Sequence, residues 1–269
     1  MRRIGIHVGQ EDIENSIIKV KKNGGNIIQL FVNISNKEKY YKLASFLKKH
    51  NMKSIVHISY TINCCKNWSE YSWWIVQFIE EIKCAAILES AYVVIHLGKQ
   101  LELSKEEALN NMYSSLIYVN ARTIELDLSI LIETSTGQGS EICYKIEDLA
   151  HFYRKILTHR NDKVKNRIKI CVDTCHIFCA GYDIRNKNTI EQYLDNFNEL
   201  IGLENIKLIH LNDSKNDIGS NVDRHENLGF GYIGCKSLIY FINRLNKLNP
   251  IIILETPHDR IYEDLKKIN

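Results

Sequence analysis

Two kinds of segment alternate along the whole 269-residue chain, and this alternation limits the folds open to it. Short β-branched runs end in polar residues, and segments with apolar residues at helical spacing follow them. Runs such as VVIH and IIILE are nearly continuously apolar, as expected of parallel strands covered on both faces. The expected strands are Arg3–Val8, Asn26–Val32, Ser54–Ser59, Tyr92–Leu97, Leu128–Thr134, Ile168–Asp173, Ile206–Leu211 and Ile251–Glu255.

Segments of helical period lie between these strands. In the longest, Trp74, Phe78, Ile82 and Ala85 form one apolar stripe, which predicts a helix covering a sheet. Eight strand–helix units predict an α/β fold, a (β/α)8 TIM barrel, as a single domain over residues 1–269. An open doubly wound sheet is the alternative, but no GxGxxG follows the first strand and no Walker GxxxxGK[ST] occurs. The expected helices include Glu11–Asn23, Tyr40–His50, Trp68–Glu89, Lys105–Glu125, Ile146–Leu157 and Thr189–Leu200.

The composition is that of an ordinary globular protein, with 45% hydrophobic and 25% charged residues. No apolar run approaches the roughly 18 residues of a membrane helix, and the N-terminal MRRIGIHVGQ lacks the apolar core of a secretory signal. We therefore expect the eight cysteines to be free thiols in a reducing intracellular compartment, the cytoplasm or nucleus. Ile, Asn and Lys are frequent, which fits an AT-rich genome such as that of a virus. If the chain is viral, we expect it to act in the virion or the host cytoplasm. We expect a monomer without membrane contact.

Nine histidine, aspartate and glutamate residues lie at or after the carboxyl ends of six expected strands. In a barrel these ends face one mouth, so side chains far apart in the sequence would meet there. Imidazole and carboxylate ligands without cysteine suit zinc or manganese. The candidate metal ligands are His57, His96, Glu133, Asp173, His176, His210, Asp223, His225 and Glu255.

The number of candidate ligands predicts three ions, because catalytic zinc usually takes three protein ligands. Asp223 and His225 leave the same side of an extended segment and can share one ion. Three zinc ions bring +6 and the four carboxylates −4, which suits an anionic phosphodiester better than a neutral sugar. Without those four carboxylates, 28 acidic residues face 35 basic ones, a surplus that could follow a nucleic-acid backbone.

Each of these residues also has a simpler interpretation. A single histidine at a strand end is more often a hydrogen-bonded core or loop residue, and a single carboxylate often caps a helix. Nine at the same end of six strands are hard to explain in that way. Cys171, Cys175 and Cys179 differ in spacing from the C-x3-C-x2-C of radical-SAM enzymes, so we expect buried thiols there. We expect His7 to line the site.

The segments around these residues resemble successive motifs of the endonuclease IV family of apurinic/apyrimidinic (AP) endonucleases. The resemblance covers nearly the whole chain, in VHISY, VVIHLG, LIETSTGQGS, ICVDTCHIFCAGYD, LIHLNDSK, VDRHENLGFGYIG and ILETP. It implies a (β/α)8 barrel with three Zn2+ ions, Mn2+ being the alternative at one site. By this resemblance His57 and His96 would hold one ion, and Glu133 would bridge it to a second. The second ion would also be held by Asp173, His210 and Glu255. The third ion would be held by His176, Asp223 and His225.

The activity implied by the resemblance belongs to base excision repair. It is hydrolysis of the phosphodiester 5′ to an abasic site in duplex DNA, leaving a 3′-hydroxyl and a 5′-deoxyribose phosphate, with 3′-phosphodiesterase or 3′-phosphatase side activity. The candidate catalytic residues are Glu133, as bridging ligand, and Glu255, which would also orient the attacking water. We expect Asn212 and Ser214 to reach the phosphate or the groups that surround the ligands, and Asp213 to orient a ligand histidine.

Two departures from the family concern DNA handling rather than metal chemistry. Members usually carry an Arg in the loop after the second strand, where this chain has Asn36 and Lys37. A bulky apolar residue usually follows the tyrosine after the third strand, where this chain has Thr61 after Tyr60. The candidate DNA-binding residues are Tyr60, Asn33 and Lys37.

Two other functions stay open on the sequence. One is a metal-dependent sugar isomerase or epimerase of the same barrel type, which would need a proton-shuttling pair beside one or two ions. The separate Asp223-x-His225 pair argues against it. The other is a catalytically inert protein that binds abasic DNA, against which the complete set of nine ligands argues.

Overall fold

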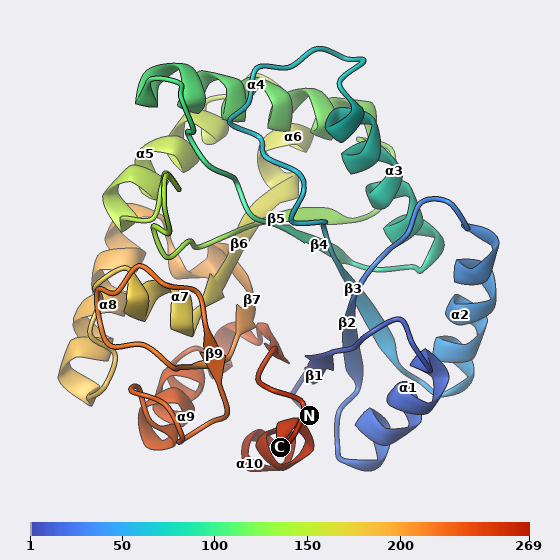
Figure 1. Ribbon diagram of the computed structural model, residues 1–269, viewed down its shortest axis with the longest axis vertical. Coiled ribbons are helices and arrows are strands. Elements are labelled where there is room, and N and C mark those ends of the chain that lie inside the picture. Colours follow the sequence, from blue (N-terminus) through green and yellow to red (C-terminus); the bar gives the residue numbers. More distant parts are fainter. Residues whose placement is uncertain (1) are drawn as a thin grey trace.

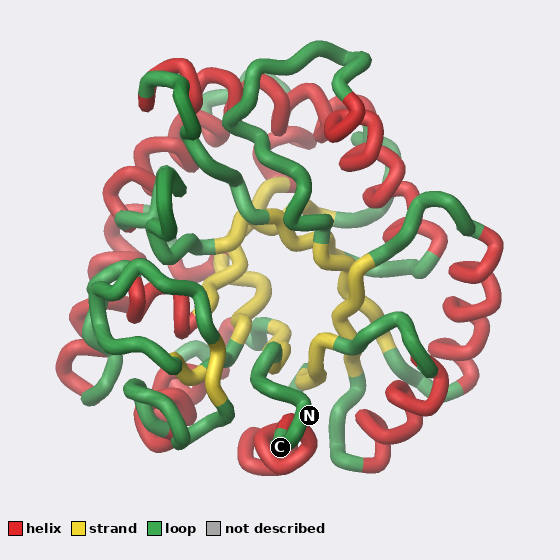
Figure 2. Tube along the Cα trace, viewed as in Figure 1, coloured by secondary structure: helices red, strands yellow, loops and turns green. Residues whose placement is uncertain are grey.

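A computed structural model describes residues 2–269 as a closed ring of parallel strands surrounded by helices (Figures 1 and 2). The predicted (β/α)8 TIM barrel is confirmed, and the eight predicted strands are present with ends that differ by at most two residues. The ring runs from β1 through β2 to β7 and closes through β10. Its strands are β1 (Ile4–His7), β2 (Ile27–Phe31), β3 (Lys53–His57), β4 (Tyr92–Ile95), β5 (Ser129–Glu133), β6 (Ile168–Asp173), β7 (Ile206–His210) and β10 (Ile251–Leu254).

The helices form the outer layer of the barrel (Figure 2). The first five are α1 (Ile13–Lys22), α2 (Glu38–Lys49), α3 (Trp73–Ile87), α4 (Lys105–Arg122) and α5 (Ile146–Leu157). They are followed by α6 (Asp162–Arg167), α7 (Thr174–Cys179), α8 (Lys187–Leu200), α9 (Cys235–Arg244) and α10 (Ile261–Ile268), with 3-10 turns at Leu203–Asn205 and Asn246–Leu248. The helices α6, α7, α9 and α10 lie outside the predicted segments.

One predicted helix begins later than expected. The segment predicted from Trp68 is helical only from Trp73, and residues 68–72 form a loop instead. In this loop Trp68 Nε1 donates a hydrogen bond to Ser114 Oγ of α4 at 3.0 Å. The predicted apolar stripe of α3 is confirmed, because Trp74, Phe78, Ile82 and Ala85 are all buried.

The apolar core has two parts, separated by the barrel wall. Successive strand residues point alternately inward and outward, so Ile28 and Val56 pack against the helices while their neighbours fill the barrel. We call the inward-facing set the interior plug. It consists of Ile27, Ile55, Val94, Leu131, Cys171, Leu208, Ile251 and Ile253.

Two short strands stand apart from the barrel. They are β8 (Asp213–Ser214) and β9 (His225–Glu226), which pair antiparallel in the long segment after β7. Within residues 2–269, no helix is long and apolar enough to cross a membrane. All eight cysteines lie in this range and are free. Seven of them are buried, among them Cys171, Cys175 and Cys179, for which burial was predicted.

Candidate metal centre

Strand alternation carries six of the nine predicted ligands to the mouth of the barrel. In each case the residue two positions earlier belongs to the interior plug, so the ligand also faces inward, one layer nearer the carboxyl ends of the strands. These pairs are Ile55 with His57, Val94 with His96, Leu131 with Glu133, Cys171 with Asp173, Leu208 with His210 and Ile253 with Glu255. The helix α7 supplies His176, the segment before β9 supplies Asp223, and β9 itself supplies His225.

Five groups of possible ligands form in the described residues, and two of them include a cysteine: Glu133 with Cys171 and His210, and Asp173 with Cys175 and His225. The other three adjoin one another and contain all nine predicted ligands. Within each group, the ligand nitrogen and oxygen atoms lie within 4.8 Å of one another. These three groups are the ones that the family resemblance implied. The first is His57, His96 and Glu133; the second is Glu133, Asp173, His210 and Glu255; the third is His176, Asp223 and His225.

The carboxylate of Glu133 joins the first group to the second. Its Oε2 lies 3.2 Å from His57 Nε2 and 3.3 Å from His96 Nε2. Its Oε1 lies 2.6 Å from His210 Nδ1, which is itself 3.3 Å from Glu255 Oε2. Each oxygen of this one carboxylate therefore faces a different group, which is the geometry of a bridging ligand.

The third group adjoins the second through Asp173. His176 Nε2 and His225 Nε2 each lie 3.2 Å from Asp223 Oδ1. His225 Nε2 is also 3.4 Å from Asp173 Oδ2. Asp223 and His225, two residues apart, thus share one group, as the sequence spacing predicted.

In two histidines of the centre, one ring nitrogen is hydrogen-bonded to a backbone carbonyl and the other faces a carboxylate. His57 Nδ1 lies 2.8 Å from the carbonyl oxygen of Ile58, and His176 Nδ1 lies 2.7 Å from that of Thr134. A carbonyl oxygen only accepts, so each of these Nδ1 atoms carries a proton, and in the neutral ring Nε2 would present a lone pair to a cation. His176 Nε2 is buried, and its 3.2 Å contact with Asp223 Oδ1 does not have the geometry of a hydrogen bond. Lone pairs and carboxylates converging on the same points fit divalent cations.

The charges of the centre act strongly on one another. Burial raises the pKa of the Asp173 carboxyl. Burial acts in the same direction on Glu255, but His210 and His7 outweigh it and hold the pKa of that carboxyl below its usual range. Burial alone would lower the pKa of His225, yet Asp173 and Asp223 raise it to about 9. The carboxylates therefore draw positive charge into the centre, and a divalent cation supplies more charge than a proton.

Known proteins share both the sequence and the barrel of this chain. The profile of the xylose isomerase-like TIM barrel family matches residues 17–268. The probable endonuclease 4 of Campylobacter fetus subsp. fetus is 34% identical to this chain, over 98% of the chain and 96% of that relative. This chain belongs to the endonuclease IV family.

Two solved structures share the fold of this endonuclease IV family member. Endonuclease IV from Thermus thermophilus has a TM-score of 0.73 and 23% sequence identity, with 98% of each chain covered. A D-tagatose 3-epimerase-like protein has a TM-score of 0.76 and 18% identity, with 100% of this chain and 95% of that chain covered. At these identities the likeness describes the barrel alone.

A buried amide beside the ligands was only partly predicted. Asn212 Nδ2 donates to Asp173 Oδ2 at 2.7 Å, and the Glu255 backbone N–H donates to Asn212 Oδ1 at 2.9 Å. Asn212 thus contacts two of the ligands directly, where the expectation was the phosphate or the groups around the ligands. A second amide, Gln29, was missed, although it is the one polar side chain in the apolar strand IIQLF. It contacts His210 and Glu255.

The expectation for Asp213 is wrong. Its carboxylate accepts hydrogen bonds from the backbone N–H groups of Gly229, Ile233 and Gly234, and so shapes the loop after β9 instead of orienting a histidine. The Ser214 hydroxyl is buried and donates to the carbonyl of Asn216, so it does not reach the mouth. Both side chains are therefore used locally, in the segment between β8 and the loop after β9.

Of the three predicted DNA-binding residues, only Tyr60 adjoins the centre. Its ring is 67% exposed, and its centroid lies 5.6 Å from those of both His57 and His96. The exposed Asn33 accepts a hydrogen bond from its own loop, from the Ser35 backbone N–H. Lys37 forms an ion pair with Glu80 of α3, in the helical layer.

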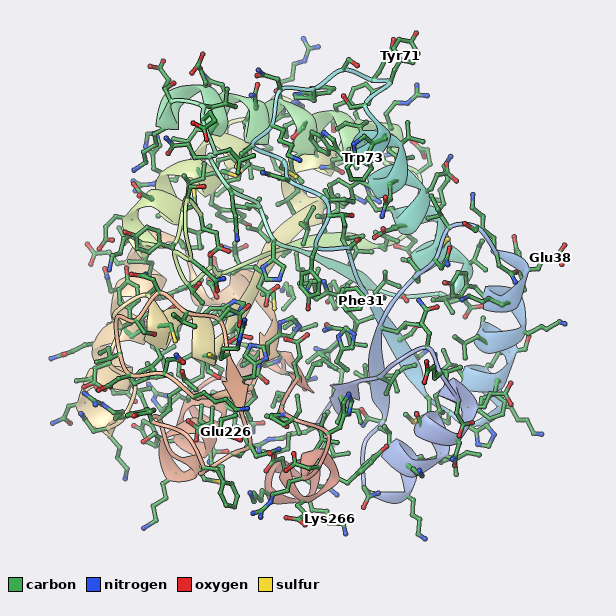
Figure 3. All side chains as sticks on the ribbon, in the orientation of Figure 1. Phe31, Glu38, Tyr71, Trp73, Glu226 and Lys266 are labelled. Atoms are coloured by element: carbon green, nitrogen blue, oxygen red, sulfur yellow. The ribbon has the colours of Figure 1, made fainter. Side chains whose placement is uncertain are left out.

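Phe31 lies near the middle of the barrel in Figure 3, at the end of β2. Its ring centroid is 4.9 Å from that of Tyr60 and 5.2 Å from that of His57. The Tyr60 ring therefore packs against the ring of Phe31. Thr61 follows, and its hydroxyl lies 2.9 Å from Ser59 Oγ. The tip of this loop therefore presents one exposed aromatic ring.

A pocket of about 360 Å³ opens beside the first and third groups. Tyr60, His96 and Asp223 form part of its wall. Three cationic residues, Lys66, Lys99 and Arg224, line it as well. The sequence contained no pattern that would have singled these three out, because they come from three separate loops.

Proposed function

We propose that this chain is a zinc-dependent AP endonuclease of base excision repair. Membership of the endonuclease IV family makes it a phosphodiester hydrolase. The proposed reaction cleaves the phosphodiester 5′ to an abasic site in duplex DNA and leaves a 3′-hydroxyl and a 5′-deoxyribose phosphate. The observation that carries the proposal is the set of three adjoining ligand groups joined by Glu133 and Asp173 at one barrel mouth.

The proposed centre holds three Zn2+ ions, one in each ligand group, with Mn2+ as the alternative at one of them. Zinc supplies an activated water near neutral pH and neutralises charge on the phosphate oxygens. The support is the donor set itself, imidazole and carboxylate without thiolate in the three groups. The buried and unpartnered His176 Nε2 supports it further.

The catalytic roles that we propose fall to Glu133 and Glu255. Glu133 spans two groups with its two oxygens, so it fixes the distance between them. Glu255 directs Oε2 toward His210 Nδ1 in the second group. From there it would orient the attacking water. Neither role requires a protein nucleophile.

Positive charge and an aromatic ring beside the centre support duplex DNA as the substrate. We propose that Lys66, Lys99 and Arg224 contact phosphates, because they line the pocket that opens next to His96. The exposed Tyr60 would stack where a base is missing, with Asn33 and Lys37 as outer contacts. Extruding a nucleotide is least costly where no base is paired, which would favour the abasic site.

Smaller parts of the proposal concern side activities and the state of the protein. A centre open on one side would also remove 3′-blocking phosphates, so we propose 3′-phosphodiesterase and 3′-phosphatase activity.

We propose a monomeric, single-domain protein in a reducing compartment inside the cell or, for a viral chain, the virion. The eight free cysteines support the reducing compartment.

The test is incision of an oligonucleotide duplex with one tetrahydrofuran abasic analogue, followed by end-group analysis of both products. The proposal predicts a single cut on the 5′ side, a 3′-hydroxyl and a 5′-phosphorylated sugar analogue. A β-elimination product or no cut would contradict it. If the protein bound the duplex but did not cut it, the result would favour the alternative that it is a catalytically inert protein that binds abasic DNA.

The D-tagatose 3-epimerase-like neighbour keeps a sugar isomerase or epimerase as the second candidate. The number of ions that the centre can hold separates the candidates. An epimerase of this type uses one or two ions, whereas the groups described here provide for three. Turnover of ketose sugars by protein holding two ions or fewer would favour the epimerase.

A further inference from the structure

We propose that Gln29 is a positioning residue that decides which atoms of two ligands face the metal ions. It would fix the proton of His210 on Nε2 and reserve one oxygen of Glu255 for the ions. The inference rests on the proposed metal centre, and it assigns a function to a residue that carries no ligand atom itself.

The position of Gln29 puts its amide directly beneath the ligands. Gln29 is the third residue of β2 and is fully buried. Ile27, two residues earlier, belongs to the interior plug, so the Gln29 side chain also points into the barrel. The amide therefore occupies the layer between the apolar plug and the mouth.

The amide contacts three side chains with both of its polar atoms. Its Oε1 lies 2.9 Å from His210 Nε2. Its Nε2 donates to Glu255 Oε1 at 2.6 Å and lies 3.0 Å from His7 Nδ1. One amide oxygen and both amide hydrogens thus have partners, and two of those partners are candidate ligands.

Only one orientation of the amide satisfies these contacts. A carboxylate oxygen only accepts, so the atom beside Glu255 must be the NH2 group. The oxygen then faces His210 Nε2, which must donate. In the neutral ring this leaves His210 Nδ1 as the lone pair, directed at the second group, 2.6 Å from Glu133 Oε1 and 3.3 Å from Glu255 Oε2.

The same contact divides the oxygens of Glu255. Oε1 takes the hydrogen bond from Gln29, and Oε2 is left facing His210 Nδ1 and the second group. A partner that orients a ligand in this way typically contributes 10–100-fold to metal affinity. A buried amide among apolar neighbours is costly unless it is hydrogen-bonded. The partners of Gln29 thus offset that cost, and two of them belong to the centre.

Two substitutions test the role of Gln29, each controlling for the other. Gln29→Met keeps the volume and adds no charge but removes all three contacts. Gln29→Glu keeps the shape and an acceptor for His210 but, as a carboxylate, has no N–H for Glu255. Ser54→Ala is the control, since Ser54 of β3 is buried and bonded to Ser90 Oγ at 2.7 Å, outside the centre.

The measurements are zinc affinity by chelator competition, zinc content by elemental analysis, the visible spectrum of the cobalt-substituted protein and the melting temperature without metal. We expect both Gln29 variants to bind one of the three ions about 10–100-fold more weakly and to show an altered cobalt spectrum. We expect Ser54→Ala to bind all three ions as the wild type does.

Three results would overturn the inference. One is wild-type zinc affinity in both folded Gln29 variants. Another is an equal loss of affinity in Ser54→Ala, which would reduce the effect to general destabilisation. The third is a wild-type protein that binds no zinc, which would contradict the metal centre itself. If the wild type incises abasic DNA with three ions bound and only the Gln29 effect is absent, the proposed function stands without this role for Gln29.

Discussion

Substituting Glu133 by glutamine should remove the link between two of the ligand groups while leaving the third intact. Glutamine has nearly the same shape, but only one of its two terminal atoms can act as a ligand, and that atom is neutral. Glu133 is one of three residues in the first group and one of four in the second. It does not belong to the group of His176, Asp223 and His225.

The expected loss of metal affinity follows from the two ligand groups that contain Glu133. Loss of a residue that only supports a ligand typically reduces affinity 10–100-fold, so loss of the ligand itself should reach at least the upper value. We expect affinity for two of the three ions to fall by at least ~100-fold, which corresponds to about 2.8 kcal/mol each. The incision rate should fall at least ~10³-fold.

The assay combines zinc content after dialysis, chelator competition, incision of the tetrahydrofuran duplex and binding to the same duplex. The account predicts about one retained ion, no detectable incision and binding within a few-fold of wild type. Glu81→Gln is the matched control, because Glu81 is also a buried glutamate but is bonded to Gln77 and the Ser59 backbone N–H. It should keep all three ions. Three tightly bound ions or normal incision in Glu133→Gln would refute the bridging role.

Four further outcomes are expected. A chelator should abolish incision and lower the melting temperature, and zinc should restore both, because ions bound only by the folded protein stabilise it. Arg224→Ala should weaken DNA binding and reduce the slope of log affinity against log salt by about 1, if its guanidinium neutralises one phosphate. Phe78→Ala should cost about 3–5 kcal/mol in unfolding experiments, because the ring is fully buried in α3. Arg244 holds the pKa of Glu191 at about 2, below the unfolded value, so this pair stabilises above pH ~4.5 and loses its effect as the pH falls toward 2. Glu191→Gln should accordingly destabilise by less than about 1 kcal/mol at neutral pH, with the difference vanishing near pH 2 in denaturation curves.

The barrel and the convergence of the nine ligands were predictable because both depend on local patterns, whereas the division of the ligands into groups was implied by the family resemblance. Apolar runs identify parallel strands, and the barrel topology gathers their carboxyl ends, so His57 and Glu255 could be brought together without any knowledge of distances. Period-two alternation then decides that the ligands face inward, since each follows a plug residue by two positions.

The remaining features depend on contacts between distant parts of the chain. Gln29 meets His210 and Glu255, which lie 181 and 226 positions away, and a single polar residue in an apolar strand does not reveal such partners. Asp213 was misassigned because its partners come from the fold of the following loop. The helix α7 has six residues, too few to show a helical period, and starts where Asp173 accepts a hydrogen bond from the His176 backbone N–H.

The most direct test of the central claim is anomalous diffraction at the zinc absorption edge from crystals of the purified protein. The account predicts three zinc peaks at the barrel mouth. One should lie among His57, His96 and Glu133, a second near His210, and the third near Asp223. Fewer than three peaks, or peaks away from these residues, would contradict the assignment of a three-zinc centre to this chain.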